Sequence, residues 1–552
     1  MPDLNEISEI KSEPYDICII GTGPAGIVLC SELADTGLRI CVLESGGLRK
    51  DSHNDDLRKV ISEGINVKDY SRERILGGAS TTWSGLSSTL DPIDMGDRSF
   101  LKIPGWPISR DELMPYWEKA VERYRFPKLS AFEKFYDLRN KGQLQPRWKN
   151  ISEKVFLAAS KPQRFGKEFG SVFEKKNVTL FYNATVLRLE GMNTGGGKKV
   201  NEAIVVSSGG QKHSIKSGFF VLATGGIENA RLLLNSTNLC KNGLGNEHDQ
   251  VGRYFMNHPK NSYGEIKLKK PLRDDVPYFF GCLKDGYAGF AGLRLNEETQ
   301  LNLGVLNSYI RLEPVFPWSR NPGVGGAVFL AKKAESLLNK WKSSKLGEIV
   351  PLRDYSETGD DNQLQDEKSD LTGFLKACFA VLFHMPSVMQ YAYARFVIKK
   401  KPAIKKIGIR NFMEMEPNFE NRITLSNKRD VNGEFIPIVS HRPSDLDRRS
   451  LITLYDILSG ELDKNDIGKL KSGLEAETEW PINQDASHHL GATRMGDNPA
   501  TSVVNRDLCL HGAENVYCIG GSVFPTSGCA NPTFTICALS IRLADHFKRI
   551  LA

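Results

Sequence analysis

Two adjacent histidines in the segment SHHLGATRMG (residues 487–496) are the side chains of this chain best suited to acid–base chemistry. A neutral imidazole accepts a proton near pH 7, so it can take the hydroxyl proton of an alcohol whose carbon loses a hydride. Neighbours in an extended segment point to opposite sides, so we expect only one of His488 and His489 to reach a common reaction centre. No set of His, Cys and carboxylate residues has metal-site spacing, and no GxSxG sequence indicates a serine nucleophile.

A strand, a glycine turn, a helix and a second strand are predicted near the start of the chain. Residues 15–20 (YDICII) are typical of a buried strand, GTGPAG (21–26) follows at once, and the next apolar residues have helical spacing. The glycines allow a tight turn and a close approach of a pyrophosphate to the helix N-terminus. The second strand, 39–43, ends at Glu44, which can accept from both ribose hydroxyls and would repel a 2′-phosphate. This pattern predicts a dinucleotide site but does not by itself separate NAD from FAD.

Three later segments favour FAD. They are RILGGASTTW (74–83), FFVLATGGIENARLLLN (219–235) and residues 514–547, which read as a strand, a Gly-Gly turn, a loop and a helix from about 532. Each alone could be an ordinary turn of an α/β protein. A chain that returns at its end to a strand–turn–helix unit is predicted to complete the sheet begun at residue 15, and FAD proteins use such a unit to bring a second helix N-terminus near the flavin.

The motifs GTGPAG, GGASTTW, ATGGIENARLLL, HHLGATRMG and GGSVFP…ANPT, in this order, resemble the glucose-methanol-choline (GMC) oxidoreductase family, and most of all its bacterial sugar and polyol oxidoreductases and pyranose oxidase-like members. The likeness extends from residue 15 to the C-terminus. It implies an α/β fold in which a discontinuous, Rossmann-like FAD-binding domain is interleaved with an α+β substrate domain built on an antiparallel sheet. The expected ranges are 15–100, 180–258 and 500–552 for the FAD-binding domain and 101–179 and 259–499 for the substrate-binding or cap domain, with a helical insertion at about 326–400.

The same resemblance implies the catalytic pair. The family's catalytic histidine stands three residues before the first glycine of its motif, which is His488 here, and its partner just before the last helix is Asn531. The chain is thus similar to the His–Asn branch of the family, in which the amide can donate to the substrate oxygen. In pyranose oxidase-like members a histidine before the tryptophan binds the flavin covalently. Thr82 stands at that position, so we expect FAD to be bound non-covalently.

The residues expected to bind the cofactor belong to the glycine turns and to the segments that resemble the family. They are Gly21, Thr22, Gly23, Ala25, Gly26, Glu44, Gly77, Gly78, Ser80, Val186, Ala223, Gly225, Gly521, Ser522, Pro532 and Thr533.

Composition indicates a globular protein of more than one domain. The chain has 552 residues, 40% of them apolar and 25% charged, and a single core rarely grows to that size. A net charge of +7 without alternating basic and aromatic residues gives no reason to expect a nucleic acid partner. Cys18, Cys30 and Cys41 lie in apolar runs and are expected as buried thiols. A charged N-terminus and the lack of 18 consecutive uncharged apolar residues predict a cytoplasmic protein.

Residues 326–400 differ in character from the rest. An amphipathic helix is followed by an acidic stretch, 354–370, and then by a long apolar region that Pro386 interrupts and lysines end. One interpretation is a helical insertion packed on the substrate domain as a lid. The alternative is a peripheral membrane contact, because apolar helix and clustered lysines together suit an anionic leaflet.

The expected activity is oxidation of a CH–OH group of a sugar-like or polyol substrate to a carbonyl, with hydride transfer to flavin N5 and His488 as the base. The alternatives are a hydrophobic alcohol such as a sterol, a flavin-containing lyase in which His488 acts alone, and a redox-inert FAD scaffold, which the His–Asn pair disfavours. The electron acceptor stays open between oxygen, a quinone and a partner cytochrome. The chain has no CxxCH motif, so any cytochrome is expected to be a separate subunit.

Overall fold

A parallel sheet brings together strands from widely separated parts of the chain. In the computed structural model its order is β5-β2-β1-β8, and β17 pairs with the other edge of β8. All five strands are rich in buried apolar residues, as expected of a parallel sheet covered on both faces. Their bounds are β1 (Tyr15–Ile20), β2 (Ile40–Leu43), β5 (Val178–Phe181), β8 (Lys212–Leu222) and β17 (Val516–Cys518). Cys18, Cys30 and Cys41 are buried free thiols, as expected.

The structure describes residues 1–551 with gaps. The residues outside the description are 11–12, 69–70, 135–143, 160, 196, 274–277, 280, 283–286, 317, 320, 342–370, 399–402, 475–486 and 552. The acidic stretch expected at 354–370 therefore lies outside the described residues.

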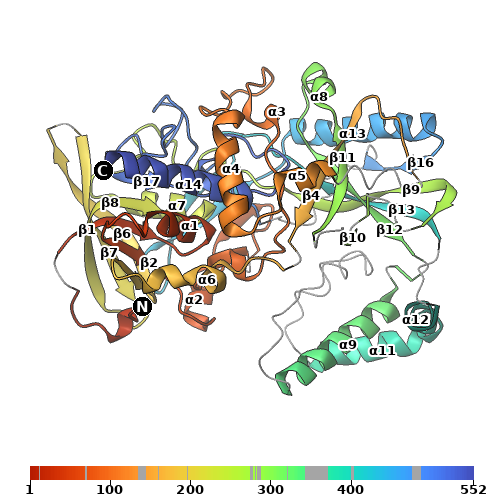
Figure 1. Cartoon of the computed structure of the whole chain (residues 1–552), viewed down its shortest axis with the longest axis horizontal. Helices are drawn as coiled ribbons and strands as arrows, with labels where there is room; N and C mark the ends of the chain where they lie inside the picture. Colours follow the sequence, from red (N-terminus) through yellow and green to blue (C-terminus); the bar gives the residue numbers. More distant parts are fainter. Residues whose placement is uncertain are drawn as a thin grey trace.

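Helices and an antiparallel meander complete the layers around the parallel sheet (Figure 1). Helix α1 (Pro24–Leu33) packs against the last helix, α14 (Thr533–Ile550), which also contacts α4 (Arg110–Tyr124). Strands β6 (Ala184–Thr194) and β7 (Gly197–Ser207) continue from β8 in antiparallel pairing. Helix α7 (Gly226–Asn235) follows β8 after a glycine turn. These contacts hold the N-termini of α1 and α14 at the same region of the molecule.

A second, antiparallel sheet forms the other half of the body and has its own core. Its order is β10-β11-β12-β13-β9-β16, with β4 paired to β11. Helix α13 (Asp445–Lys464) buries Leu451, Leu454, Tyr455 and Leu458 in the core of this half. The strands are β4 (Ile151–Ala158), β9 (Lys260–Leu272), β10 (Gly281–Cys282), β11 (Ala288–Leu295), β12 (Tyr309–Val315), β13 (Ile404–Phe412) and β16 (Gly468–Lys471).

Shorter elements connect the two halves. A three-stranded sheet has the order β14-β15-β3. The bounds of these elements are η1 (Leu4–Glu6), α2 (Ser52–Asp56), β3 (Ile61–Gly64), η3 (Gly78–Thr81), α3 (Pro92–Met95), α5 (Leu129–Lys134), α6 (Phe165–Glu168), η5 (Gly170–Glu174), α8 (Glu297–Leu303), β14 (Arg422–Arg429), β15 (Phe435–His441) and η9 (Gly521–Val523). The whole is a mixed α/β fold with several sheets.

Four helical segments form an arm that stands off the body below the antiparallel sheet (Figure 1). They are α9 (Pro322–Trp341), α11 (Leu371–Phe383), α12 (Met385–Ala392) and the π-helical turn η7 (Tyr393–Ile398). The break between α11 and α12 puts Pro386 in the first turn of α12, where the missing N–H is harmless. Among the described residues no single helix is long and apolar enough to cross a bilayer, although Thr372–Phe383 and Met385–Ile398 together, bent by 85°, match one in length and composition.

Candidate functional site

A cavity of about 510 Å³ lies at the carboxyl ends of the parallel strands. Its lining includes the residue after β1 (Gly21), the residue after β2 (Glu44), the residue after β8 (Ala223) and a turn residue after β17 (Gly520). Strands of one parallel sheet end at the same edge, and ligands of open α/β sheets bind outside that edge. The cavity continues to the antiparallel sheet, whose Phe412 also lines it.

The first glycine turn leaves room for a ligand at the N-terminus of α1. Gly21 has a φ of 108°, which a residue with a side chain rarely adopts. A Cβ on Gly26 would lie 1.9 Å from the Gly21 carbonyl oxygen, so this glycine lets the helix pack against the turn. A Cβ on Gly23 would meet nothing within 4 Å, because Gly23 borders the cavity. The first-turn N–H groups of α1 lack partners within the helix and suit an anionic group here.

Glu44 is held rigidly at the end of β2. Its Oε2 accepts from the backbone N–H of Thr22 at 3.0 Å and from the Thr22 hydroxyl, and its Oε1 accepts from the N–H of Gly46 at 2.8 Å. Burial raises the pKa of Glu44, and these donors act in the opposite direction. The side chain borders the cavity, and each carboxylate oxygen has acceptor capacity for further donors such as sugar hydroxyls.

Most of the residues expected at the site line this cavity. The two expected catalytic residues, His488 and Asn531, do so, together with Gly21, Thr22, Gly23, Ala25, Glu44, Gly78, Ser80, Val186, Ala223, Gly225, Gly521, Pro532 and Thr533.

Three of the expected cofactor-binding residues do not line the cavity and instead support the turns that do. Gly26 packs the start of α1. Gly77 donates its N–H to the Thr22 hydroxyl at 3.3 Å. The Ser522 hydroxyl oxygen accepts from the Asn229 amide at 3.0 Å. Their side chains or backbones are buried behind the surface that a ligand would touch.

A second histidine determines how the His488 ring is oriented. His258 Nδ1 lies 2.8 Å from His488 Nδ1, and His258 Nε2 lies 3.3 Å from the carbonyl oxygen of Ser527. The two rings meet edge to face at 89°. Burial lowers the pKa of His258 to about 4, so the ring is neutral near pH 7. The sequence patterns described above assign no role to His258.

The hydrogen-bond partners of the two histidines determine which ring nitrogens carry a hydrogen. A carbonyl oxygen only accepts, so the hydrogen of neutral His258 is on Nε2 and its Nδ1 is an acceptor. His488 must then donate from its own Nδ1, and the hydrogen-free nitrogen of neutral His488 is Nε2. Nε2 is therefore the atom at which His488 can accept a proton.

A buried ion pair stabilises the segment that supports His258. Arg98 donates to both carboxylate oxygens of Glu414, at 2.7 and 2.8 Å, and neither side chain is exposed. Glu414 also accepts from the Gly528 N–H at 3.2 Å, next to the Ser527 carbonyl that faces His258. Burial alone would raise the pKa of Glu414, but Arg98 holds it below its ordinary value. The pair thus fixes the loop that positions the two histidines.

Both His488 and His489 contribute to the cavity lining. Their rings have different surroundings. The His489 ring stacks on Phe255 with centroids 5.8 Å apart, whereas the His488 ring contacts His258. The difference favours His488 for proton transfer.

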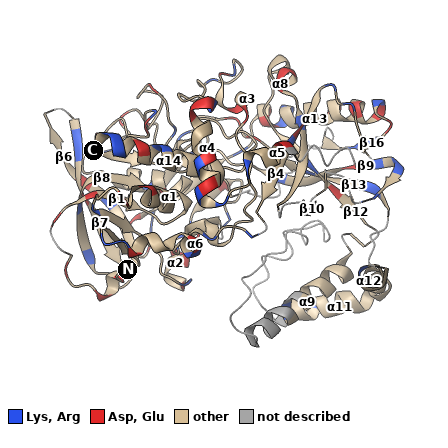
Figure 2. Cartoon of the chain, viewed as in Figure 1, with Lys and Arg blue, Asp and Glu red and all other residues tan. Residues whose placement is uncertain are grey.

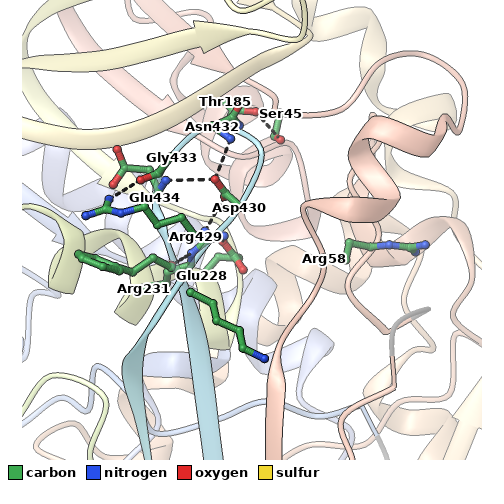
Figure 3. A network of polar contacts seen from close by, with 12 residues as sticks. Ser45, Arg58, Thr185, Glu228, Arg231, Arg429, Asp430, Asn432, Gly433 and Glu434 are labelled. Atoms are coloured by element: carbon green, nitrogen blue, oxygen red, sulfur yellow. Dashed lines mark hydrogen bonds and ion pairs between the residues drawn. The ribbon is translucent and has the colours of Figure 1, made fainter.

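The sequence patterns did not predict a charged cluster in which Arg74 and Glu228 line the cavity. Figure 3 shows its members Glu228, Arg231 and Asp430. Glu228 accepts from Arg74 at 2.8 Å and pairs with Arg231 at 3.4 Å, and Arg231 also donates to Asp430 at 2.6 Å. Arg74 donates to the Ser45 hydroxyl at 2.8 Å. Although burial would raise it, these arginines lower the pKa of Glu228 to about 2. Arg74 and Glu228 lie within two of the motifs quoted above, but their pairing needs contact across 154 residues.

The wall contributed by the antiparallel sheet was also missed. Its lining residues are Lys260, Arg311, Arg410 and Phe412.

Comparison with known proteins agrees with this geometry. A family model described as GMC oxidoreductase matches residues 417–540. The chain is 23% identical to paromamine 6′-oxidase of Streptomyces fradiae, over 96% of this chain and 90% of that protein. It is 22% identical to 2-methyl-1,2-propanediol dehydrogenase of Mycolicibacterium austroafricanum, over 98% and 96%. The fold is similar to the crystal structure of pyridoxine 4-oxidase from Mesorbium loti, with a TM-score of 0.53 and 14% identity over 97% of this chain and 99% of that one. The chain is therefore similar to the glucose-methanol-choline oxidoreductases, a family of flavin-dependent enzymes.

Proposed function

We propose that this protein oxidises a CH–OH group of a sugar-like or polyol substrate to a carbonyl, with His488 as the base. The observation that carries the proposal is the contact between His258 and His488, because it leaves the basic nitrogen of His488 at Nε2. The named activities of the relatives are consistent with it, since they are oxidases and dehydrogenases of alcohol-bearing compounds.

The residues at the strand ends fit FAD. The open space at Gly23 and the N-terminus of α1 suit the diphosphate, and Glu44 suits the ribose hydroxyls. Open space also borders Gly225 and Gly520, where a Cβ would meet nothing within 4 Å. Thr82 lines the cavity and cannot form the covalent link made by a histidine, so we propose that FAD is bound non-covalently. The bound flavin supplies the hydride acceptor.

The chain's own residues would prepare the substrate. His488 takes the hydroxyl proton at Nε2, and its Nδ1–H stays on His258. The amide of Asn531 donates to the substrate oxygen and orients the C–H bond. A neutral His258 does not compete for the proton, because burial lowers its pKa to about 4 and its Nδ1 already accepts from the Nδ1–H of His488.

We also propose the domain division expected from the sequence, with residues 15–100, 180–258 and 500–552 as the FAD-binding domain and 101–179 and 259–499 as the substrate domain. The pairing of β1, β2, β5, β8 and β17 in one parallel sheet supports it. Strand β5 begins at Val178, which suggests a boundary slightly before residue 180.

The test is anaerobic flavin reduction by a panel of sugars, polyols and sterols. His488→Ala should slow reduction by roughly 10²- to 10⁴-fold and leave FAD bound, because a positioned base is worth about that factor. A near-normal rate in this variant would exclude His488 as the base. Bleaching by sterols alone would support the hydrophobic-alcohol alternative, and product formation without bleaching would support a lyase.

We further propose that the arm contacts the surface of an anionic bilayer. Many of its large apolar side chains are exposed, up to 80% for Phe383. They are Phe374, Leu375, Phe379, Leu382, Phe383, Met385, Met389, Tyr393, Phe396, Val397 and Ile398. The small residues face inward instead, since a Cβ on Gly326 of α9 would lie 2.8 Å from the Ala377 carbonyl of α11. Small residues at a helix–helix contact with large apolar residues outside are typical of helices in lipid.

Charge identifies the kind of surface. Residues 371–398 contain no Asp or Glu but do contain Lys376 and Arg395, and Lys399–Lys401 follow in the sequence. Figure 2 shows α11 and α12 almost without charged residues. An apolar surface with basic residues and no acidic ones suits anionic headgroups rather than another basic protein surface. The arm is held to the body by Trp318 and Tyr391, whose rings lie 5.6 Å apart.

Vesicle co-sedimentation at low salt tests this surface. The holoenzyme should bind vesicles of phosphatidylcholine and phosphatidylserine more than phosphatidylcholine alone. Replacing Phe379, Leu382, Phe383 and Phe396 by Ser should abolish binding. Leu301→Ser with Leu303→Ser, at exposed positions of α8, is the matched control and should not change it. Absence of vesicle binding, or a concentration-dependent dimer that the four Ser substitutions dissolve, would assign the arm to another partner.

A further inference from the structure

Two glycine turns of the parallel sheet border the cavity and are joined by one buried amide. The β8 turn (residues 223–225) follows β8, and the β17 turn (residues 519–522) follows β17. Gly225 in the first turn and Gly520 in the second have φ values of 94° and 114°, and both line the cavity. The side chain of Asn229, near the start of α7, is fully buried and reaches both turns. It is not one of the residues that line the cavity, so it acts on a ligand only through these turns.

Each end of the Asn229 amide binds one of the two turns. Its Oδ1 accepts from the N–H of Thr224 at 2.9 Å and from the Thr224 hydroxyl at 2.7 Å. Its Nδ2 donates to the carbonyl oxygen of Ile519 and to the Ser522 hydroxyl oxygen, both at 3.0 Å. A backbone N–H only donates and a carbonyl only accepts, so these partners determine which end of the amide faces which turn. The four hydrogen bonds hold the two turns at a fixed separation.

The β17 turn also holds the segment 487–496, which contains His488. The N–H of Thr493 donates to the Ser522 carbonyl oxygen at 2.8 Å, and the Thr493 hydroxyl donates to the Ser522 hydroxyl oxygen at 2.6 Å. The Ser522 hydroxyl oxygen thus accepts from Asn229 on one side and from Thr493 on the other. All three side chains are fully buried, so this chain of contacts is not exchanged with solvent.

The backbone next to His488 is packed against both elements that Asn229 joins. A Cβ on Gly226, the first residue of α7, would lie 2.2 Å from the carbonyl oxygen of His489. A Cβ on Gly521 would lie 2.7 Å from the same oxygen. The two glycines therefore let the His489 backbone approach closely, and any change in their separation would move the catalytic segment.

We infer that Asn229 is a positioning residue that holds the two glycine turns and the His488 segment in one arrangement, and so sets the place of His488 relative to bound FAD. This inference rests on the proposed alcohol oxidation and adds a residue to its machinery. The base and the flavin must be aligned closely, because a misplacement of about 1 Å can slow a reaction by about 10²-fold. Asn229 touches neither cofactor nor substrate and acts through Ser522 and Thr224.

The experiment compares two buried asparagines at opposite ends of the same sheet. Asn229→Ala removes the amide at the cavity end. Asn515→Ala is the matched control, because Asn515 directly precedes β17, at the end of the sheet away from the cavity. The Asn515 side chain is also buried, donates to the carbonyl oxygens of Val200 and Gly218 at 2.7 and 2.8 Å, and accepts from the Val200 N–H at 2.9 Å.

The two variants should lose Tm to a similar degree but differ in the behaviour of the flavin. In Asn229→Ala the limiting rate of anaerobic flavin reduction, at full FAD occupancy, should be roughly 10- to 100-fold lower. The substrate concentration at half-saturation should change less than about threefold, because the lining of the cavity keeps its side chains. FAD release on dilution of the holoenzyme, followed by flavin fluorescence, should be at least about fivefold faster. Both rates should change less than about twofold in Asn515→Ala, and equal effects of the two variants would overturn the inference.

A second variant carries the test if Asn229→Ala does not fold. Ser522→Ala removes the one oxygen that accepts from both Asn229 and Thr493 and leaves the other contacts of the amide in place. It should lower the limiting rate of reduction by about fivefold or more. A wild-type limiting rate in Ser522→Ala would overturn the assigned link to the His488 segment.

Readouts that need no turnover separate this inference from the proposed activity. They are the rate of FAD release and the visible circular dichroism of the bound flavin. If no alcohol reduces the flavin, changes in both for Asn229→Ala but not for Asn515→Ala still support the positioning role. Alcohol oxidation at the wild-type rate in Asn229→Ala, with unchanged FAD release, would sink the inference and leave the oxidation standing.

Discussion

Replacing His258 tests the orientation of the catalytic histidine without touching it. His258→Leu removes the acceptor of the His488 Nδ1–H, whereas His258→Gln retains a carbonyl oxygen that can accept it. We expect the flavin of the Leu variant to be reduced more slowly than that of the Gln variant, and both more slowly than the wild type. The His488 residue is half-buried, but its Nδ1–H faces the buried ring of His258, so the loss of this acceptor matters.

The magnitude follows from that hydrogen bond. Leaving a buried donor unsatisfied costs about 1–3 kcal/mol, and about 1.4 kcal/mol is a tenfold change in rate, so the Leu variant should be roughly 5- to 150-fold slower. The effect should appear in the limiting rate of reduction more than in the substrate concentration at half-saturation, because His258 acts through His488. A change in substrate binding alone would indicate a structural role.

The pH dependence provides a second readout. Burial lowers the pKa of His258 to about 4, below the value of an unfolded histidine near 6.5. Because the unfolded state binds this proton more readily than the folded state, the free energy of unfolding is highest above about pH 6.5 and decreases as the pH falls toward 4. Urea denaturation of the wild type should show this loss, and His258→Gln should lack it. His248→Gln, at an exposed histidine, is the control.

The assay is stopped-flow flavin reduction under anaerobic conditions, with FAD content measured for each variant. Unchanged limiting rates in His258→Leu, at full FAD occupancy, would refute the assigned hydrogen positions. A Leu variant no slower than the Gln variant would contradict the acceptor role specifically.

Three further predictions concern the cofactor turn and the buried charges. Gly23→Ala should leave thermal stability unchanged but weaken FAD binding, because the added Cβ enters open cavity space. Gly26→Ala should destabilise the fold, because the added Cβ would lie 1.9 Å from the Gly21 carbonyl oxygen. FAD titration and melting curves test this difference, and the same behaviour of both variants would disprove it. Burial, with Asp91 and Glu414 nearby, raises the pKa of Asp94 to about 7. The stability that protonated Asp94 contributes is therefore present below about pH 4 and is lost as the pH rises through 7. Asp94→Asn should abolish that loss when the free energy of unfolding is measured at several pH values, and the same pH dependence in both proteins would argue against it. Glu414→Gln should lower the free energy of unfolding by about 3–5 kcal/mol, because it leaves Arg98 buried opposite a neutral group. Asp35→Asn, at an exposed ion pair, is its control and should lower it by at most about 1 kcal/mol. Equal losses in the two variants would count against a stabilising role of the buried pair.

The sequence predicts the first glycine turn at the cavity, because the geometry of this turn is local. Gly21, Gly23 and Ala25 line the cavity, and they do so through a turn whose shape depends on neighbours a few residues away. Glu44 could be predicted from its place at the end of a strand. Some expected cofactor-binding residues, such as Ser522, lie in the same turns but do not line the cavity, a difference that depends on tertiary packing.

The sequence by itself also determined the motifs that resemble a flavin-dependent family, among them the segments that contain His488 and Asn531. An imidazole and a carboxamide suit proton transfer and hydrogen bonding.

Only the tertiary structure decided how that chemistry is controlled. His258 and His488 are 230 residues apart, yet their nitrogens lie 2.8 Å from each other, and this contact selects the basic nitrogen. The register of β9, β13 and β12 brings Lys260, Arg410 and Arg311 onto one face, and a shift of one residue would turn each of them away. Both results depend on pairings between distant segments, whose geometry is set by the packing of two sheets and cannot be read from local sequence patterns.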